Sequence, residues 1–202
     1  MPDTPARPGR PRDRRIDPLV REATLALLVD GGYAALRIDD VARRAGVAKT
    51  TIYRRWASLA ELVLDTVEDA LGPRVVPETG DVEADLEAVV RAVHQSLVAN
   101  PVGWSLPALG LDLSRDPELG RDYRRRIIEP PREQAIRLVR AGQGQGRFDA
   151  AVDAETLVDA VGGIWAFRQL VGLPPPPVED VVAVVRASLH ICPTRGRRRS
   201  PR

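Results

Sequence analysis

Few of the residue types that catalyse reactions or hold metal ions occur in this chain of 202 residues. It has one cysteine, Cys192, and two histidines, His94 and His190. This set excludes a disulfide framework and a cysteine-based zinc site, and it disfavours a histidine-rich metal site. The carboxylates of Asp39 and Asp40 are neighbours in sequence, so on a helix they point about 100° apart and do not form a catalytic pair. The sequence therefore predicts no catalytic residue, no metal and no cofactor.

A second group of carboxylates has helical spacing. Asp65, Glu68 and Asp69 stand at i, i+3 and i+4, so they share one face of a helix. We interpret this face as a solvated acidic patch.

The most informative stretch is basic. Residues 49–55, KTTIYRR, combine cations that bind phosphates with hydroxyls and arginines that bind base edges. Ile52 and Trp56 are spaced i, i+4 and are expected to be buried beneath them. A surface helix with solvated charges is the competing interpretation, and it leaves the clustering unexplained. Together with the basic residues just before this stretch, the predicted DNA-contacting residues are Arg37, Arg43, Arg44, Lys49, Thr50, Thr51, Tyr53, Arg54 and Arg55.

The segment before the basic stretch must position it. Ile38, Val41, Ala42 and Ala45 follow the spacing i, i+3, i+4, i+7 of an amphipathic helix. Gly46 suits the left-handed backbone of a sharp turn. Two short helices that meet at such a turn form a helix-turn-helix.

Helical periodicity covers most of the remaining chain, and strand signals are nearly absent, so we expect an all-α fold. A capping box at Ser58–Glu61 starts one helix, and Pro130-Pro131 is expected to kink or split another. Helices are expected over about 18–31, 59–71, 81–99, 104–113, 116–142, 153–171 and 178–190. The predicted organisation is a disordered basic arm (1–15), a helix-turn-helix domain with a connecting helix (16–71), a helical-bundle domain (72–192) and a disordered basic tail (193–202).

Charge is segregated along the chain, although the net charge is only +2. The arm and tail carry +3 and +5, residues 16–56 carry +2, and residues 57–192 carry −8. A basic front on an acidic body indicates that the front meets a polyanion. No apolar run reaches the roughly 18 residues of a membrane span, and the N-terminus lacks a signal-peptide pattern, so we expect a cytoplasmic protein without membrane contact.

The run GVAKTTIYRRW, residues 46–56, resembles the most recognisable segment of the TetR family of bacterial transcriptional repressors. The resemblance covers residues 16–71, about a quarter of the chain. It implies that the helix carrying this run enters the DNA major groove, with Lys49, Thr50, Thr51 and Tyr53 as contacts and Arg55 near bases or phosphates. It also implies about nine helices, a homodimer formed by the last two, a palindromic operator, and a small-molecule effector that shifts the helix at 59–71.

Three positions depart from the family pattern. Arg37 and Ala48 stand where the two short helices usually begin with a Ser or Thr cap, and Leu59 replaces a common phosphate-binding Lys. Leu59 is therefore not a predicted DNA contact.

The resemblance also suggests where the effector and the second subunit lie. We expect a pocket among residues 62–71, 86–109 and 120–128, although His94 and Trp104 have core packing as an alternative. Its predicted lining is His94, Leu97, Trp104, Leu109, Tyr123 and Ile127. Gly162-Gly163 in a long apolar helix indicates a closely packed neighbour, since each glycine costs about 1 kcal/mol of helix propensity. The predicted dimer interface is Val158, Val161, Trp165, Val181, Val185 and Leu189.

These expectations favour a DNA-binding transcriptional repressor that a small molecule releases from its operator. Two alternatives stay open: a DNA-binding regulator without an effector, and a small helical enzyme or carrier with a coincidental motif.

Overall fold

A computed structural model describes residues 15–76, 78–98 and 101–190, without the side chains at 101, 104, 105 and 190. Within these ranges the chain forms helices and no strands, which confirms the all-α prediction. The predicted basic tail, and the predicted basic arm apart from Arg15, lie outside the described residues. No helix in the described ranges is long and apolar enough to span a bilayer.

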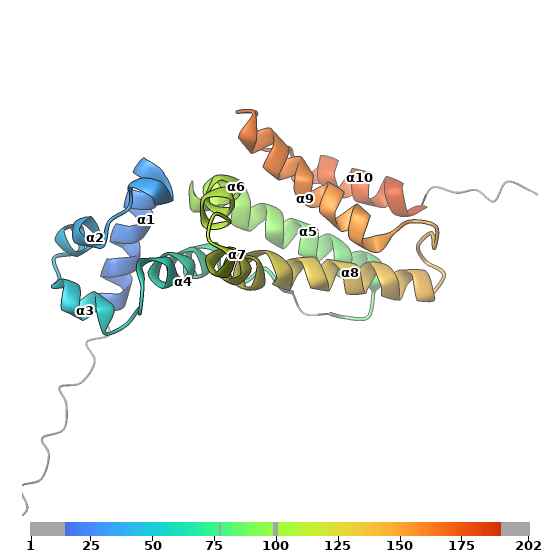
Figure 1. Ribbon diagram of the computed structural model, residues 1–202. Coiled ribbons are helices and arrows are strands. Elements are labelled where there is room, and N and C mark those ends of the chain that lie inside the picture. The colour runs from blue at the N-terminus through green and yellow to red at the C-terminus, as the bar shows by residue number, and fades with distance from the viewer. Residues whose placement is uncertain (1–14, 77, 99–100, 191–202) are drawn as a thin grey trace, which may run out of the picture.

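The first helices lie at one end of the molecule, and the last two lie toward the other end (Figure 1). The N-terminal helices are α1 (Ile16–Ala35), α2 (Ile38–Ala45), α3 (Lys49–Tyr53) and α4 (Leu59–Leu71). The remaining helices are α5 (Val82–Val98), α6 (Pro101–Leu113), α7 (Pro117–Tyr123), α8 (Glu129–Gly144), α9 (Ala154–Leu170) and α10 (Val178–His190). A turn of π-helix, Arg124–Ile128, joins α7 to α8 without a break. If α7, the π turn and α8 are counted as one continuous helix, the described residues contain nine helices.

Glycine shapes the helix-turn-helix. Gly46 has φ 67° and ψ 31°, the left-handed conformation that a residue with a side chain rarely adopts, and its N–H donates to the carbonyls of both Ala42 and Arg43 at the end of α2. Gly32 (φ 69°) interrupts α1, near its predicted end. Neither Arg37 nor Ala48 provides a side-chain cap for α2 or α3, as the sequence indicated.

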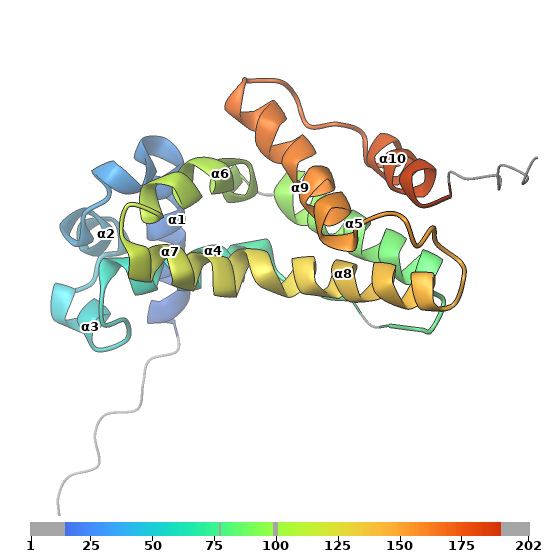
Figure 2. The same cartoon turned by 45° about the vertical axis from the view of Figure 1, so that its right-hand side comes forward.

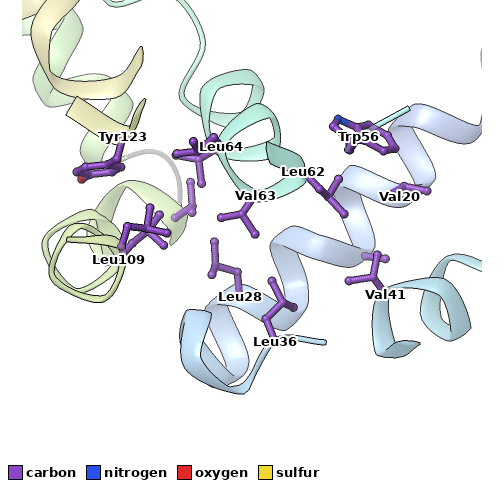
Figure 3. Packing of buried hydrophobic residues seen from close by; sticks show 14 of the residues in the cluster. Val20, Leu28, Leu36, Val41, Trp56, Leu62, Val63, Leu64, Leu109 and Tyr123 are labelled. Carbon is purple, nitrogen blue, oxygen red and sulfur yellow. The ribbon is translucent and has the colours of Figure 1, made fainter. Parts of the chain in front are cut away.

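Helix α4 is the centre of the first hydrophobic core. Its Leu62, Val63 and Leu64 lie between α1 and the side chains of Leu109 and Tyr123 (Figure 3). The predicted cap is confirmed, because Ser58 Oγ accepts from the Glu61 N–H at 3.0 Å. This core joins α1–α4 to α6 and the π turn, so α4 is packed from both sides.

The predicted kink at Pro130-Pro131 takes the form of the π turn just before it. Neither proline has an N–H, so in an α-helix the carbonyls of Arg126 and Ile127 would lose their partners. The guanidinium of Arg74 replaces them: it donates to the carbonyl of Ile127 and, at 3.4 Å, to that of Arg126. The long helix therefore continues to Gly144 instead of splitting.

A second core unites α5, α8, α9 and α10. Among the described residues of α8, Gln134 is the buried polar side chain. Its amide donates to the Val76 carbonyl (2.6 Å) and accepts from the Val76 N–H (3.0 Å). This pair of bonds fixes the segment after α4 against α8. Figure 2 shows α8 running along the lower edge of this half of the molecule, with α9 and α10 above it in this view.

The end of α8 offers a test of this core. A Cβ at Gly142 would collide with the ring of Phe148, whereas one at Gly144 would meet nothing within 4 Å. We expect Gly142→Ala to lower the free energy of unfolding by about 1–3 kcal/mol, because overpacking forces the ring to move. Gly144→Ala, the matched control, should leave it unchanged or raise it by up to about 1 kcal/mol. Chemical denaturation of both variants measures this, and equal stabilities would contradict the packing described.

Candidate functional site

Helix α3 presents two different faces. Ile52 and Trp56 are buried against the first core, as predicted. Lys49, Thr50 and Arg54 are exposed, and Tyr53 keeps 52% of its surface accessible despite being aromatic. Of the predicted contacts on α3, Thr51 is half-buried. The exposed face thus carries a cation, a hydroxyl, a phenol and a guanidinium, which are donors for phosphates and base edges.

Carboxylates of the same domain accompany several of the cations. Lys49 pairs with Asp39, Arg43 with Asp40 at 2.9 Å, and Arg44 with Asp30 at 3.7 Å. Exposed pairs of this kind contribute about 0–1 kcal/mol, so a phosphate can replace the carboxylate at little cost. The carboxylates nevertheless add negative charge to the surface that would meet DNA.

Two predicted contacts have structural partners instead. Arg37 donates to the carbonyls of Ala34 and Leu36, both at 2.9 Å, at the end of α1. The side chain of Arg55 is only 13% exposed, because it pairs with Asp17 in the first turn of α1. Arg55 therefore connects the segment after α3 to the start of α1, which is a role that the sequence analysis did not anticipate.

The acidic residues of α4 are not merely solvated, which corrects our interpretation. Asp65 Oδ2 accepts from the indole Nε1 of Trp56 at 2.9 Å and from Arg21 Nε at 2.9 Å. One carboxylate thus connects the segment after α3 with helix α1 and helix α4.

One turn further, α4 is connected to the other half of the molecule. Glu68 Oε2 accepts from Nε (2.8 Å) and Nη2 (2.6 Å) of Arg126 in the π turn. The carbonyl of the same Arg126 accepts from Arg74. Sequence reasoning missed these partners, although the acidic spacing on α4 and the run Arg124–Arg126 were both visible.

A cavity of about 390 Å³ lies next to this connection, between α5, α6, the long helix and α9. This volume is within the roughly 300–1,000 Å³ of typical ligand pockets. Most of its walls are apolar. Of the predicted lining residues, Leu97, Tyr123 and Ile127 line it, and the side chain of Trp104 lies outside the described residues.

The other two predicted lining residues lie elsewhere. Leu109 is buried in the first core. His94 stands behind the wall, where its Nδ1 accepts from Trp165 Nε1 at 3.3 Å. Burial lowers the pKa of His94 and so favours the neutral ring that this bond requires. Trp165, on the other hand, does line the cavity.

The few polar groups of the cavity differ in how well they are partnered. Tyr123 donates to the Leu106 carbonyl at 2.9 Å, and burial raises its pKa far above the usual value, so it stays protonated. Arg132 forms two bonds to Asp159, at 2.6 and 2.9 Å. Arg74 and Gln169 complete the polar lining.

The side chains predicted for a dimer interface are mostly buried within the single chain. Val161, Trp165, Val181, Val185 and Leu189 all belong to the second core. Val158 is half-buried and lines the cavity together with Val161 and Trp165. Their helical spacing indicated an apolar face correctly, but that face packs on α5 and α8, so its burial needs no second copy.

Comparisons with known proteins agree with this geometry. Residues 20–66 match the family described as bacterial regulatory proteins, tetR family, and residues 76–188 match the tetracyclin repressor-like C-terminal domain. The chain is 32% identical to the uncharacterized HTH-type transcriptional regulator Rv1556 of Mycobacterium tuberculosis, over 80% of each chain. It is 30% identical to the DNA-binding transcriptional repressor TetR of Mycobacteroides abscessus, over 74% of this chain and 80% of that one.

A solved structure is similar as well. The crystal structure of the TetR family transcription regulator SCO0332 shares 34% identity, with a TM-score of 0.60, covering 89% of this chain and all of that one.

The neighbouring residues Arg54 and Arg55 should respond differently to mutation. Arg55→Ala removes a largely buried side chain and its pair with Asp17, so we expect the protein to lose about 1 kcal/mol of stability. Arg54→Ala, the matched control, removes an exposed side chain and should change stability by less than about 0.5 kcal/mol. Thermal unfolding of the two variants measures the difference, and an equal loss would contradict the role of Arg55.

Proposed function

Because this chain belongs to the tetracycline-repressor family of bacterial transcriptional regulators, we propose that it is a dimeric repressor that a small molecule releases from a palindromic operator. The observation that carries this proposal is the combination, in one molecule, of an exposed basic recognition helix and a ligand-sized cavity, joined through α4. Its site of action would be the bacterial cytoplasm, where the DNA is. No step in the proposal requires covalent chemistry.

The proposed DNA contact is made by α3. Its exposed Lys49, Thr50, Tyr53 and Arg54 would enter the major groove, with Thr51 beside them, while Arg43 and Arg44 at the end of α2 would bind phosphates. Two such helices in a two-fold dimer require half-sites about one helical turn apart, or a small multiple of it.

Charge-altering variants test the DNA contact. We expect Lys49→Ala to weaken operator binding and to make the salt dependence shallower by about one unit, because one phosphate contact is lost. Asp39→Asn should have the opposite effect, about threefold or more tighter binding at low salt, since it removes the carboxylate that Lys49 faces. Electrophoretic mobility shifts with a duplex selected from a random pool provide the measurement.

Asp122→Asn is the control for the second variant, because Asp122 forms a comparable exposed pair with Arg125 on the long helix. It should bind DNA as the unmodified protein does. If Lys49→Ala binds normally with an intact fold, α3 is not the recognition helix.

The proposed dimer surface uses the exposed sides of α9 and α10. Gly163, Phe167 and Leu170 follow the spacing i, i+4, i+7, and Phe167 and Leu170 are 62% and 65% exposed. On α10 the small side chains of Ala183, Val184 and Ala187 are exposed in the single chain. Exposed apolar side chains on both of the last two helices are the kind of surface that a protein interface would cover. A Cβ at Gly163 would meet nothing within 4 Å, which leaves room for a second helix.

A charge on this surface should separate the subunits. We expect the unmodified protein to sediment as a dimer and Phe167→Glu to sediment mainly as a monomer, because a buried unpaired carboxylate is costly. Leu111→Glu on α6, where Leu111 is 64% exposed, is the control and should stay dimeric. A dimer that survives Phe167→Glu would place the interface elsewhere, and a monomeric unmodified protein would contradict the dimer itself.

Release by an effector is supported by the route from the cavity to α3. The cavity borders the π turn, the π turn is bound to α4 through Arg126 and Glu68, and α4 is bound to Trp56 through Asp65. A regulator without an effector would need no cavity of this size, so the structure favours the effector-released version. The mobility-shift assay with the selected duplex also tests release, because candidate compounds can be added to the protein–DNA complex and the loss of bound DNA measured.

A further inference from the structure

The cavity holds a cation without an anionic partner. Arg74 lines it, and its two hydrogen bonds both go to backbone carbonyls, those of Arg126 and Ile127. Among the described residues, no carboxylate lies within ion-pair distance of Arg74. The acidic residue whose charge acts on Arg74 is Glu68, and its carboxylate is already bound to Arg126. The other guanidinium of the cavity, that of Arg132, is matched by Asp159.

Two polar atoms at the cavity wall are also buried without a partner. They are the Nε of Arg74, a donor, and the Oε1 of Gln169, an acceptor. Buried polar atoms are paired in the great majority of native structures, because an unsatisfied group costs about 1–3 kcal/mol. The donor and the acceptor belong to side chains that line one apolar cavity, and both are covered in the present conformation. A ligand with an apolar body and polar ends would give both atoms partners once these side chains turn toward it.

We propose that the cavity binds an apolar organic carboxylate, and that Arg74 is the residue that receives its carboxylate group. This inference rests on the proposed function, since it names the chemical class of the effector. An anion is favoured over a neutral molecule because it provides the missing counter-charge for Arg74 in a low-dielectric site. A hydroxyl or amide N–H elsewhere on the ligand would donate to Gln169 Oε1.

The location of Arg74 gives the ligand a means of acting on α4. The Nε atom is covered in the present conformation, so a carboxylate in the cavity binds the guanidinium by turning it. A turned guanidinium leaves the carbonyls of Arg126 and Ile127, which have no proline N–H to return to. The π turn then loses its support at the residue whose side chain binds Glu68. Ligand binding and the present π turn therefore oppose each other.

Matched pairs of probes test the charge preference. Decanoate is compared with decanol, and naphthoate with naphthol, by calorimetric titration of the full chain. We expect at least one carboxylate to bind about tenfold or more tightly than its alcohol. Arg74→Gln should reduce that carboxylate's affinity by about ten- to a hundredfold, the range for a hydrogen bond to a charged group, and leave the alcohol's affinity nearly unchanged.

Two further variants control for indirect effects. Arg74→Lys keeps the charge and should retain part of the preference for the carboxylate, which distinguishes loss of charge from loss of fold. The double variant Arg132→Gln, Asp159→Asn removes the ion pair of the same cavity, whose two charges cancel. It should preserve the preference for the carboxylate over the alcohol. Equal binding of acid and alcohol, no binding of either carboxylate, or a preference that survives Arg74→Gln would each overturn the inference.

Operator release separates this inference from the proposed function. In a mobility-shift assay, the bound carboxylate should release DNA from the unmodified protein and release less from Glu68→Ala, which binds the ligand but lacks the contact to Arg126. If the carboxylate binds through Arg74 and the DNA stays bound, the ligand class is upheld and effector release is refuted. If alcohols release the DNA and carboxylates do not, effector release is upheld and the ligand class is refuted.

Discussion

The connection between the two halves of this protein depends on how the long helix accommodates two consecutive prolines. Pro130 and Pro131 deprive two carbonyls of their partners inside a helix that has to continue, because its later residues build the second core. The π turn and the guanidinium of Arg74 provide the compensation. A charged side chain is therefore drawn from the segment after α4 to the wall of the cavity. The same turn holds Tyr123 and Ile127 against the first core and directs Arg126 to Glu68.

In the proposed mechanism, helix α4 would transmit a shift of that turn, because packing leaves it little freedom to move independently. Seven of its residues are buried: Ala60, Leu62, Val63, Leu64, Thr66, Val67 and Leu71. Polar contacts at Asp65 and Glu68 fix its remaining side to Trp56, Arg21 and Arg126. Packed side chains resist gradual deformation, so a shift of the π turn would move α4 as a body. Since Trp56 lies three residues after the end of α3 and its N–H donates to the Ile52 carbonyl, α3 would move with it.

The sequence predicted local features well, since they depend on residues a few positions apart. The bounds of α4 and α10, the turn at Gly46 and the cap at Ser58 all follow from spacing and side-chain type. Contacts between distant segments could not be predicted in this way. Arg55 reads as a DNA contact until Asp17, 38 residues away, is known to lie beside it. Likewise, Trp165 has the spacing of an interface residue, and only the packing of α9 on α5 and α8 shows that it belongs to the core. Arg74 has no local signature at all, because its partners are carbonyls 52 and 53 residues away in the sequence.

The strength of these contacts limits how a switch can operate. An exposed ion pair such as Glu68–Arg126 contributes about 0–1 kcal/mol, whereas a hundredfold change in DNA affinity requires about 2.7 kcal/mol of coupling. Breaking that pair alone cannot release the operator. In the proposed mechanism, the larger part must come from unequal affinity of the ligand for two arrangements of the π turn. The guanidinium of Arg74 can supply this difference, because it is half-buried and has no carboxylate partner among the described residues. Coupling is reciprocal, so DNA that holds α4 in its present position also opposes the turning of Arg74. In this proposed mechanism, the half-buried guanidinium of Arg74 is the point at which ligand and operator would compete for the same helix.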